Sequence, residues 1–177
     1  MHTYPNRVLQ DLQKQLPSLR KKYLKYNDYK DQTLSDIFTE NQLANMVTLK
    51  AQELASCLFI NQGNSQFSKQ QLPAEAQLSQ VYAMLPTDFD GDGIEDLVLG
   101  GNQTRIKPEL GINNASYGLT LKGLGNGTFQ PLRAIESGIF VKGEVRGITT
   151  LKVGGKEQLV FVRNDDELKA FQQKRAQ

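Results

Sequence analysis

An acidic segment near the middle of the chain has the residue types and the spacing of a cation-binding loop. Residues 88–96 read D-F-D-G-D-G-I-E-D, which places carboxylates at loop positions 1, 3, 5 and 9. Carboxylates this close repel one another, and a hard divalent cation with oxygen ligands relieves the repulsion. The two glycines lack a Cβ, so the backbone can bend tightly around one centre. The segment predicts a calcium loop whose ligands are Asp88, Asp90, Asp92, Asp96 and the main-chain carbonyl of Ile94. The alternative is an acidic hairpin turn, because Asp and Gly dominate turns in general.

The residues around this loop decide which kind of calcium loop it could be. An EF-hand needs a bidentate Glu at loop position 12 and a helix on each side, whereas position 12 here is Leu99. The flanking segments 81–85 and 97–101 are short and apolar, and the second is closed by glycines, as in strands. The loop is therefore expected to join two strands, which excludes the EF-hand and the loop-then-helix pattern of dockerins.

A strand, the loop D-x-D-x-D-G-x-x-D and then L-V-L-G-G-N together resemble the FG-GAP or VCBS repeat family. The resemblance runs from about residue 46 to the C-terminus. It is closest to repeats of large secreted or surface-attached bacterial proteins that carry ASPIC/UnbV-type segments. It implies a mainly β fold of antiparallel four-stranded β-propeller blades, with Ca²⁺ as the bound ion. It also gives Asp88, Asp90, Asp92 and Asp96 the side-chain ligand roles, Ile94 the carbonyl role, and the protein an extracellular, periplasmic or cell-surface location.

Internal repetition supports propeller blades independently of that family. Residues 61–67, N-Q-G-N-S-Q-F, match residues 123–129, G-L-G-N-G-T-F, at an offset of 62 residues, and the same offset places Asn102 on Asn164. At this offset Asp88, Asp90, Asp92 and Asp96 correspond to Thr150, Lys152, Gly154 and Gln158. The second copy is thus expected to be a metal-free hairpin that turns at Gly154-Gly155, with Lys152 in solvent. Because only the first copy keeps its carboxylates, the sequence predicts one calcium ion per chain.

The pattern predicts two regions, a helical insertion or linker over 1–45 and about two blade repeats over 46–177. In the first region, apolar residues recur at helical spacing until Pro17, and Thr39 with Gln42 forms a predicted capping box for a helix over 40–46. Its apolar side chains are expected to dock on the blades. In the second region the expected strands are 56–61, 67–72, 80–85, 96–101, 117–122, 128–133, 144–153, 158–163 and 168–171. A long loop over 103–116 interrupts them.

Composition narrows the function classes. The 177 residues carry 21 Lys plus Arg and 19 Asp plus Glu, a net charge of +2 that does not favour nucleic-acid binding. No apolar run approaches the ~20 residues of a membrane span. His2 is the single histidine and Cys57 the single cysteine, so Ser-His or Cys-His catalysis lacks a plausible base and zinc is unsupported. Cys57 is expected to be a small core residue.

The function expected from these features is non-enzymatic: a calcium-stabilised scaffold or interaction module. Four blades of this repeat would need about 250 residues, so the chain is expected to be a piece of a larger propeller. Its partners would be the remaining blades and a protein or glycan bound at a propeller face or at loop 103–116. Two alternatives stay open. The parent could be a hydrolase or carbohydrate-active enzyme with this piece as a non-catalytic or face-forming part, or an adhesin that recognises glycans or protein.

Overall fold

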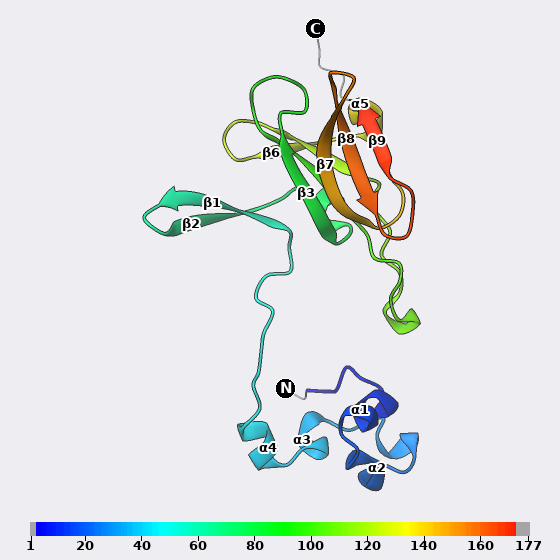
Figure 1. The fold of residues 1–177 in the computed structure, drawn as a ribbon. Helices are drawn as coiled ribbons and strands as arrows, with labels where there is room; N and C mark the ends of the chain where they lie inside the picture. The colour runs from blue at the N-terminus through cyan, green and yellow to red at the C-terminus, as the bar shows by residue number, and fades with distance from the viewer. Residues whose placement is uncertain (1–2, 173–177) are drawn as a thin grey trace. The chain divides into compact units, whose positions relative to one another are not determined.

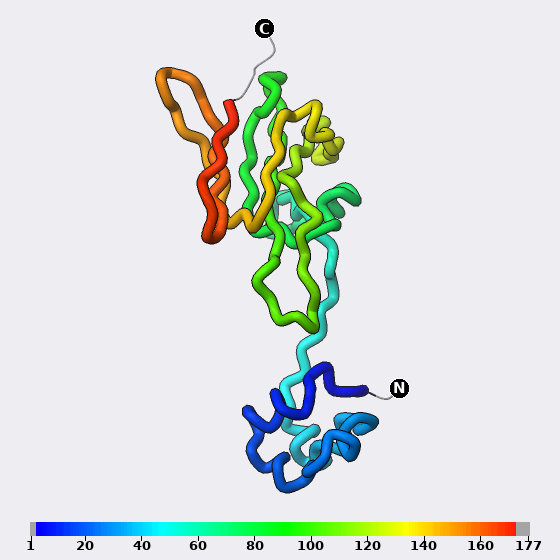
Figure 2. The backbone as a smooth tube through the Cα atoms, turned by 90° about the vertical axis from the view of Figure 1, so that its right-hand side faces the viewer, coloured from blue at the N-terminus to red at the C-terminus, as the bar shows by residue number. Residues whose placement is uncertain are grey.

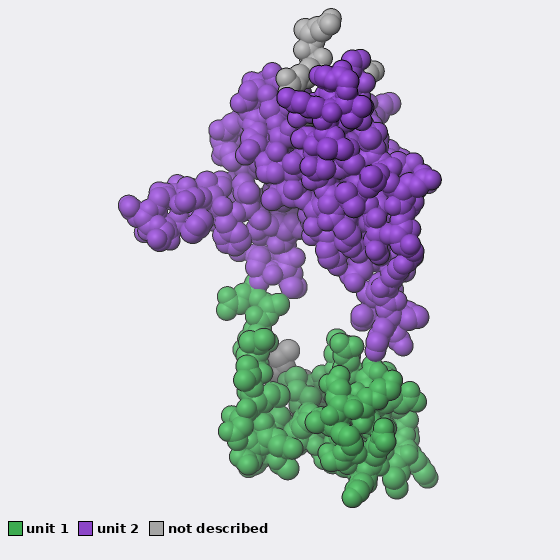
Figure 3. Space-filling view, in the orientation of Figure 1, with its two compact units in different colours: residues 1–52 green, residues 53–177 purple. Residues whose placement is uncertain are grey.

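A computed structural model describes residues 3–172 of the chain. It divides into two compact units, Met1–Gln52 and Glu53–Gln177, shown in two colours in Figure 3. The division falls a little beyond the expected boundary between residues 45 and 46. Residues 46–56 form neither helix nor strand, and Val47, Leu49 and Leu54 are largely exposed within them. His2 lies outside the described residues.

The first unit is a group of short helices around its own small core. They are α1 (Leu9–Gln15), α2 (Leu19–Lys22), the 3₁₀ helix η1 (Tyr26–Asp28), α3 (Leu34–Ile37) and α4 (Glu40–Ala44). The predicted capping box is confirmed, because the Thr39 amide donates to Gln42 Oε1 at 2.9 Å and the Gln42 amide donates to Thr39 Oγ1 at 3.3 Å. The buried apolar side chains form a cluster within this unit, made of Leu9, Leu19, Tyr23, Tyr29 and Ile37. Docking of the unit on the blades stays a prediction.

The second unit is mainly β, as predicted, with three antiparallel sheets (Figure 1). The first sheet is the hairpin of β1 (Cys57–Gly63) and β2 (Gln66–Gln71). The second has the order β3 (Val81–Thr87), β4 (Asp96–Gly101), β5 (Leu119–Gly123) and β6 (Phe129–Leu132). The third has the order β7 (Val145–Val153), β8 (Lys156–Arg163) and β9 (Lys169–Gln172). Short helices η2 (Ala74–Gln77), η3 (Pro108–Leu110) and α5 (Ala134–Ser137) lie in the connections. Over residues 3–172 the strands form separate sheets rather than a closed barrel or propeller.

The second sheet is the middle layer of this unit, and its strand β4 is buried along its whole length. On one face, Ala83 and Val98 share a core with residues of the third sheet, among them Val145, Leu159 and Phe161. On the other face, Leu97, Leu99 and Leu121 pack against Leu72, Ala76 and the β1 residue Leu58. The stretch L-V-L reads as a continuous apolar run because alternate residues of a strand face opposite layers. Figure 2 allows the chain to be followed through these strands.

The registers of the hairpins β1–β2 and β5–β6 are the same at an offset of 62 residues, and strands β4 and β8 keep this offset. The pairs Leu58↔Gln70, Phe59↔Lys69, Ile60↔Ser68 and Asn61↔Phe67 of the first hairpin correspond to Thr120↔Leu132, Leu121↔Pro131, Lys122↔Gln130 and Gly123↔Phe129 of β5–β6. Hairpins β3–β4 and β7–β8 each carry a register shift at their first residue. Asn102 and Asn164 also match, because their amides donate to the carbonyls of Gln80 and Glu144 at 3.1 and 2.8 Å.

The predicted correspondence of the loop residues is wrong in one strand. Thr87 pairs with Asp96, whereas it is Leu151 that pairs with Gln158. Asp88, the residue after Thr87, therefore corresponds to Lys152, the residue after Leu151, and not to Thr150 as predicted. The predicted matches of Asp90 with Lys152 and of Asp92 with Gly154 are also wrong. The physical reason is that the second hairpin closes with the two-residue turn Gly154-Gly155, so its loop is shorter than the acidic one. The expected hairpin and the solvent-exposed Lys152 are both confirmed.

A buried hydroxyl in the middle sheet gives a first testable prediction. Thr120 is 1% exposed, and its Oγ1 has no hydrogen-bond partner among the described residues. Valine has nearly the same shape and removes the unsatisfied group, so Thr120→Val is expected to raise the free energy of unfolding by about 1 kcal/mol. Urea unfolding measures this change, with Thr149→Val, at an exposed strand position, as the control. A loss of stability in Thr120→Val would contradict the prediction.

Candidate metal centre

The acidic loop connects two strands whose pairing fixes both of its ends. Thr87 at the end of β3 pairs with Asp96 at the start of β4. Gly91 and Gly93 both have φ of +84°, a backbone conformation that other residues adopt at a steric cost. The two glycines therefore allow the tight bends that the motif predicts, and the loop residues 88–95 return the chain directly into β4.

Three of the four predicted carboxylate ligands meet in this loop. Asp88, Asp90 and Asp96 each offer an oxygen, and these oxygens all lie within 4.8 Å of one another. Asp96 is 1% exposed, while Asp88 and Asp90 are partly buried. Carboxylates gathered at this spacing suit an oxygen-liganded cation. Asp92 lies outside this group, and the role of the Ile94 carbonyl stays a prediction.

Asp96 ties the loop to two strands. Its Oδ2 accepts the Phe89 amide at 2.8 Å, and its Oδ1 accepts the Gly123 amide of β5 at 2.7 Å. Gly123 must be glycine for this approach, because a Cβ there would lie 2.2 Å from the Glu95 carbonyl oxygen. One buried carboxylate therefore fixes the position of the loop relative to β4 and β5.

The remaining acidic residues hold the loop in shape through its own amides. Asp88 Oδ1 and Oδ2 accept the Gly91 and Gly93 amides at 2.8 and 3.2 Å. Asp90 Oδ1 and Asp92 Oδ1 each accept the amide two residues further on, at 3.2 and 2.9 Å. Carboxylate oxygens have several lone-pair sites, so an oxygen that accepts an amide can also ligate a cation. These hydrogen bonds within the loop therefore help to fix its shape.

Lys122 is a residue of this centre that the sequence pattern did not indicate. Its ammonium group contacts Asp90 Oδ2 and lies 2.8 Å from Asp92 Oδ2. The pKa of Lys122 is raised, mainly by its hydrogen bond to Asp90 and next by its hydrogen bond to Asp92. The pKa of Asp92 is lowered, mainly by the hydrogen bond from Lys122 and next by the one from the Ile94 amide. The signal was not local, because Lys122 comes from β5, more than 25 residues after the loop. Its offset counterpart Ile60 carries no charge.

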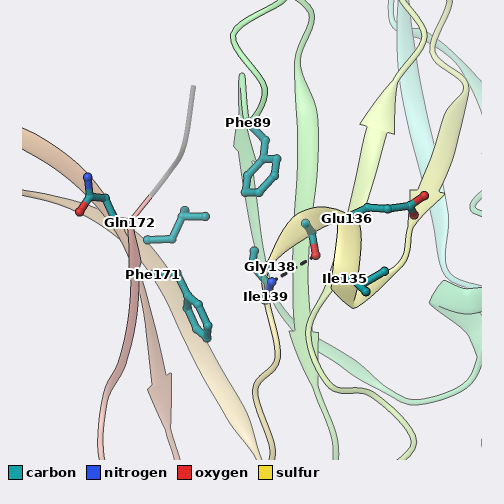
Figure 4. A pocket seen from close by; sticks show the side chains of 9 residues that line it. Phe89, Ile135, Glu136, Gly138, Ile139, Phe171 and Gln172 are labelled. Atoms are coloured by element: carbon teal, nitrogen blue, oxygen red, sulfur yellow. Dashed lines mark hydrogen bonds between the residues drawn. The ribbon is translucent and has the colours of Figure 1, made fainter. Parts of the chain in front are cut away.

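Phe89 links the loop to the hydrophobic core. It packs against the core cluster shared by the second and third sheets. It also lines an open cleft of about 390 Å³ together with α5 and the β9 residues Phe171 and Gln172, as Figure 4 shows. Among the described residues that line this cleft, Glu136 is the one with a carboxylate. Its Oε1 forms an ion pair with Arg133 Nη2 at 3.0 Å. The cleft therefore places an aromatic side chain of the acidic loop beside a mixed polar and apolar surface.

A second polar cluster attaches the long loop 103–116 to the third sheet. Glu144 is 5% exposed and its Oε1 accepts the amides of Thr104 and Arg105, the latter at 2.9 Å. Its Oε2 accepts Asn164 Nδ2 at 2.7 Å and pairs with Arg146 at 2.9 Å. These hydrogen bonds, of which the one from the Thr104 amide has the largest effect, lower the pKa of Glu144 to about 2. The loop is thus bound to the sheet by one ionised carboxylate, and a Gln103↔Asn113 bridge closes its base.

Comparisons with protein-family models, with curated proteins and with solved structures gave no match. No helix among residues 3–172 has the length and apolar character needed to cross a bilayer. The fold and the centre together define a mainly antiparallel β protein with a cluster of acidic residues that could bind a metal ion.

Proposed function

We propose that this chain is a calcium-binding, propeller-type β module that serves as an extracellular scaffold or interaction domain rather than as an enzyme. The observation that carries the proposal is the meeting of Asp88, Asp90 and Asp96 at the tip of one strand pair. Their oxygens belong to one short loop, so an ion bound there would join the ends of β3 and β4 to β5 through Asp96.

Calcium is favoured over other metals by the kind of ligand present. The loop offers carboxylate and carbonyl oxygens and contains no histidine or cysteine, the ligands that zinc and copper prefer. Magnesium requires near-ideal octahedral geometry and keeps several waters, whereas calcium accepts six to eight oxygens in a flexible arrangement. A loop with four aspartates and two flexible glycines fits calcium better.

The arrangement of sheets supports the propeller-type part of the proposal. The four-stranded antiparallel sheet contributes to a core on each face, one shared with the three-stranded sheet and the other with Leu58 of the two-stranded sheet. Phe59 of β1 is 60% exposed, while Leu121 at the matching register of β5 is fully buried. Leu121 is covered by Leu72, Ala76 and Leu97 on its face of the sheet. Among the described strands, β5 also has β4 on one edge, whereas the equivalent edge of β1 is unpaired. Further blades are therefore proposed as partners, and loop 103–116 as the contact site for a protein or glycan.

Calcium titration of the whole chain tests the proposal. We expect one calcium per chain, with free ion at about 100 times Kd adding roughly 2.7 kcal/mol of stability. Asp90→Ala is expected to weaken binding at least about tenfold, because it removes one of the clustered ligands. Glu95→Ala removes the same charge from the same loop outside the cluster and is expected to bind like the unchanged protein. Calorimetry measures the affinities, and thermal unfolding in calcium and in chelator measures the stabilisation.

Two results would overturn the proposal. One is no heat of binding for the unchanged protein at millimolar calcium. The other is equal weakening by Asp90→Ala and Glu95→Ala, which would show a diffuse charge effect rather than a site.

A further inference from the structure

Lys122 already supplies a positive charge to the acidic loop. Its ammonium group contacts Asp90 and Asp92, two of the residues that the motif predicts as calcium ligands. Asp92 is turned toward Lys122 and lies outside the group formed by Asp88, Asp90 and Asp96. If a metal ion is to be bound by Asp92, the ion pair between Asp92 and the Lys122 ammonium group must therefore break.

The backbone of Lys122 is held in place next to the loop. The pair Leu97↔Leu121 sets the register of β4 and β5, and the Gly123 amide, next along β5, donates to Asp96. A charge tethered this way has a high effective concentration at the loop and does not diffuse away. Its side chain remains 32% exposed, so the ammonium group has solvent into which it can turn.

We propose that Lys122 is a built-in competing cation: it neutralises the loop when no metal is bound and must leave Asp90 and Asp92 when calcium binds. This inference rests on the proposed calcium site and adds what sets its affinity. Calcium and the ammonium group cannot both approach Asp90 closely, because like charges repel strongly at a partly desolvated site. Lys122 thus shifts the binding curve toward the 10⁻⁴–10⁻³ M calcium range typical of extracellular modules.

The test compares Lys122→Met with Lys152→Met in the full chain. Methionine replaces the aliphatic part of the lysine side chain at nearly the same length and removes the charge. Lys152→Met makes the same charge change near the turn of the β7–β8 hairpin. Two partly exposed ion pairs, each contributing a factor of up to about five, predict that Lys122→Met binds calcium about tenfold more tightly. Lys152→Met is expected to change the affinity less than about twofold. Calorimetric titration with calcium chloride at fixed ionic strength measures both.

Thermal unfolding gives a second readout that a purely structural role for Lys122 would not produce. In chelator, Lys122→Met is expected to melt below the unchanged protein, since its four aspartates lose their internal cation. In saturating calcium the difference is expected to disappear. A deficit of the same size in both conditions would show that Lys122 supports strand β5 rather than the loop, and would overturn the inference.

The outcomes separate this inference from the proposed function. Equal calcium affinity for the unchanged protein and Lys122→Met, or weaker binding by Lys122→Met, overturns the inference while the calcium site stands. No binding by either protein at millimolar calcium overturns the site itself, and the inference with it.

Discussion

Gly123→Ala is expected to destabilise the protein by about 3 kcal/mol and to weaken the proposed calcium binding at least tenfold. The added Cβ would lie 2.2 Å from the Glu95 carbonyl oxygen and 3.0 Å from Ile94 Cγ2, so strand β5 or the end of the loop must move. Movement of either one lengthens the 2.7 Å hydrogen bond from the Gly123 amide to Asp96. Asp96 would then be displaced from Asp88 and Asp90. Urea unfolding in chelator measures the first effect, and calorimetric titration measures the second.

Gly147→Ala is the matched control for this change. Gly147 also lies in a strand of the second unit, but a Cβ there would meet Val162 Cβ at 3.5 Å, an ordinary contact. Alanine loses less backbone freedom on folding than glycine, so Gly147→Ala is expected to be neutral or slightly stabilising. Similar losses of stability in the two variants would show that the close contact between Gly123 and the loop is not the reason why glycine is needed there.

Glu144→Gln is expected to lower the midpoint of thermal unfolding at neutral pH by roughly 5–10 °C. The buried carboxylate of Glu144 accepts from two backbone amides and from Asn164, and it pairs with Arg146. Glutamine removes the charge and turns one acceptor into a donor that faces other donors. The guanidinium of Arg146, which lies 4.2 Å from the Tyr82 ring centroid, would lose its anionic partner. Loop 103–116 is expected to detach first, and amide hydrogen exchange at Thr104 and Arg105 reports it.

The pH dependence of stability gives an independent check on Glu144. Folding lowers the pKa of Glu144 from 4.5 to about 2, so the unfolded chain takes up a proton at a higher pH than the folded one. The contribution of Glu144 to stability is therefore fully present above pH 4.5 and is lost as the pH falls from 4.5 toward 2. Glu144→Gln is expected to flatten the stability curve in this window. Glu109→Gln, an exposed position of the same loop, is the control, and an unchanged slope in Glu144→Gln would contradict the assignment.

Local signals in the sequence were sufficient for the strands and for most of the acidic loop. Apolar runs bounded by Gly-Asn and Gly-Gly turns place each strand within a few residues, because turn residues act through their own backbone conformation. The carboxylates of Asp88, Asp90 and Asp96 also come together through local structure. A loop with flexible glycines is closed by its own short-range hydrogen bonds, such as the one from the Gly91 amide to Asp88. The capping box at Thr39 is likewise contained within four residues.

Tertiary structure alone decided which distant residues complete these elements. Lys122 reaches Asp90 and Asp92 only because β5 pairs with β4, and Glu144 reaches Thr104 only because the third sheet packs on the second. The two-residue turn at Gly154-Gly155 shifted the correspondence of the loop residues, since strand register depends on cross-strand pairing rather than on a constant offset. The sequence by itself determined the acidic loop and the β class of the protein. The charge that opposes those acids, and the surfaces that bury β4, depend on contacts between segments far apart in the chain, which no short-range pattern encodes.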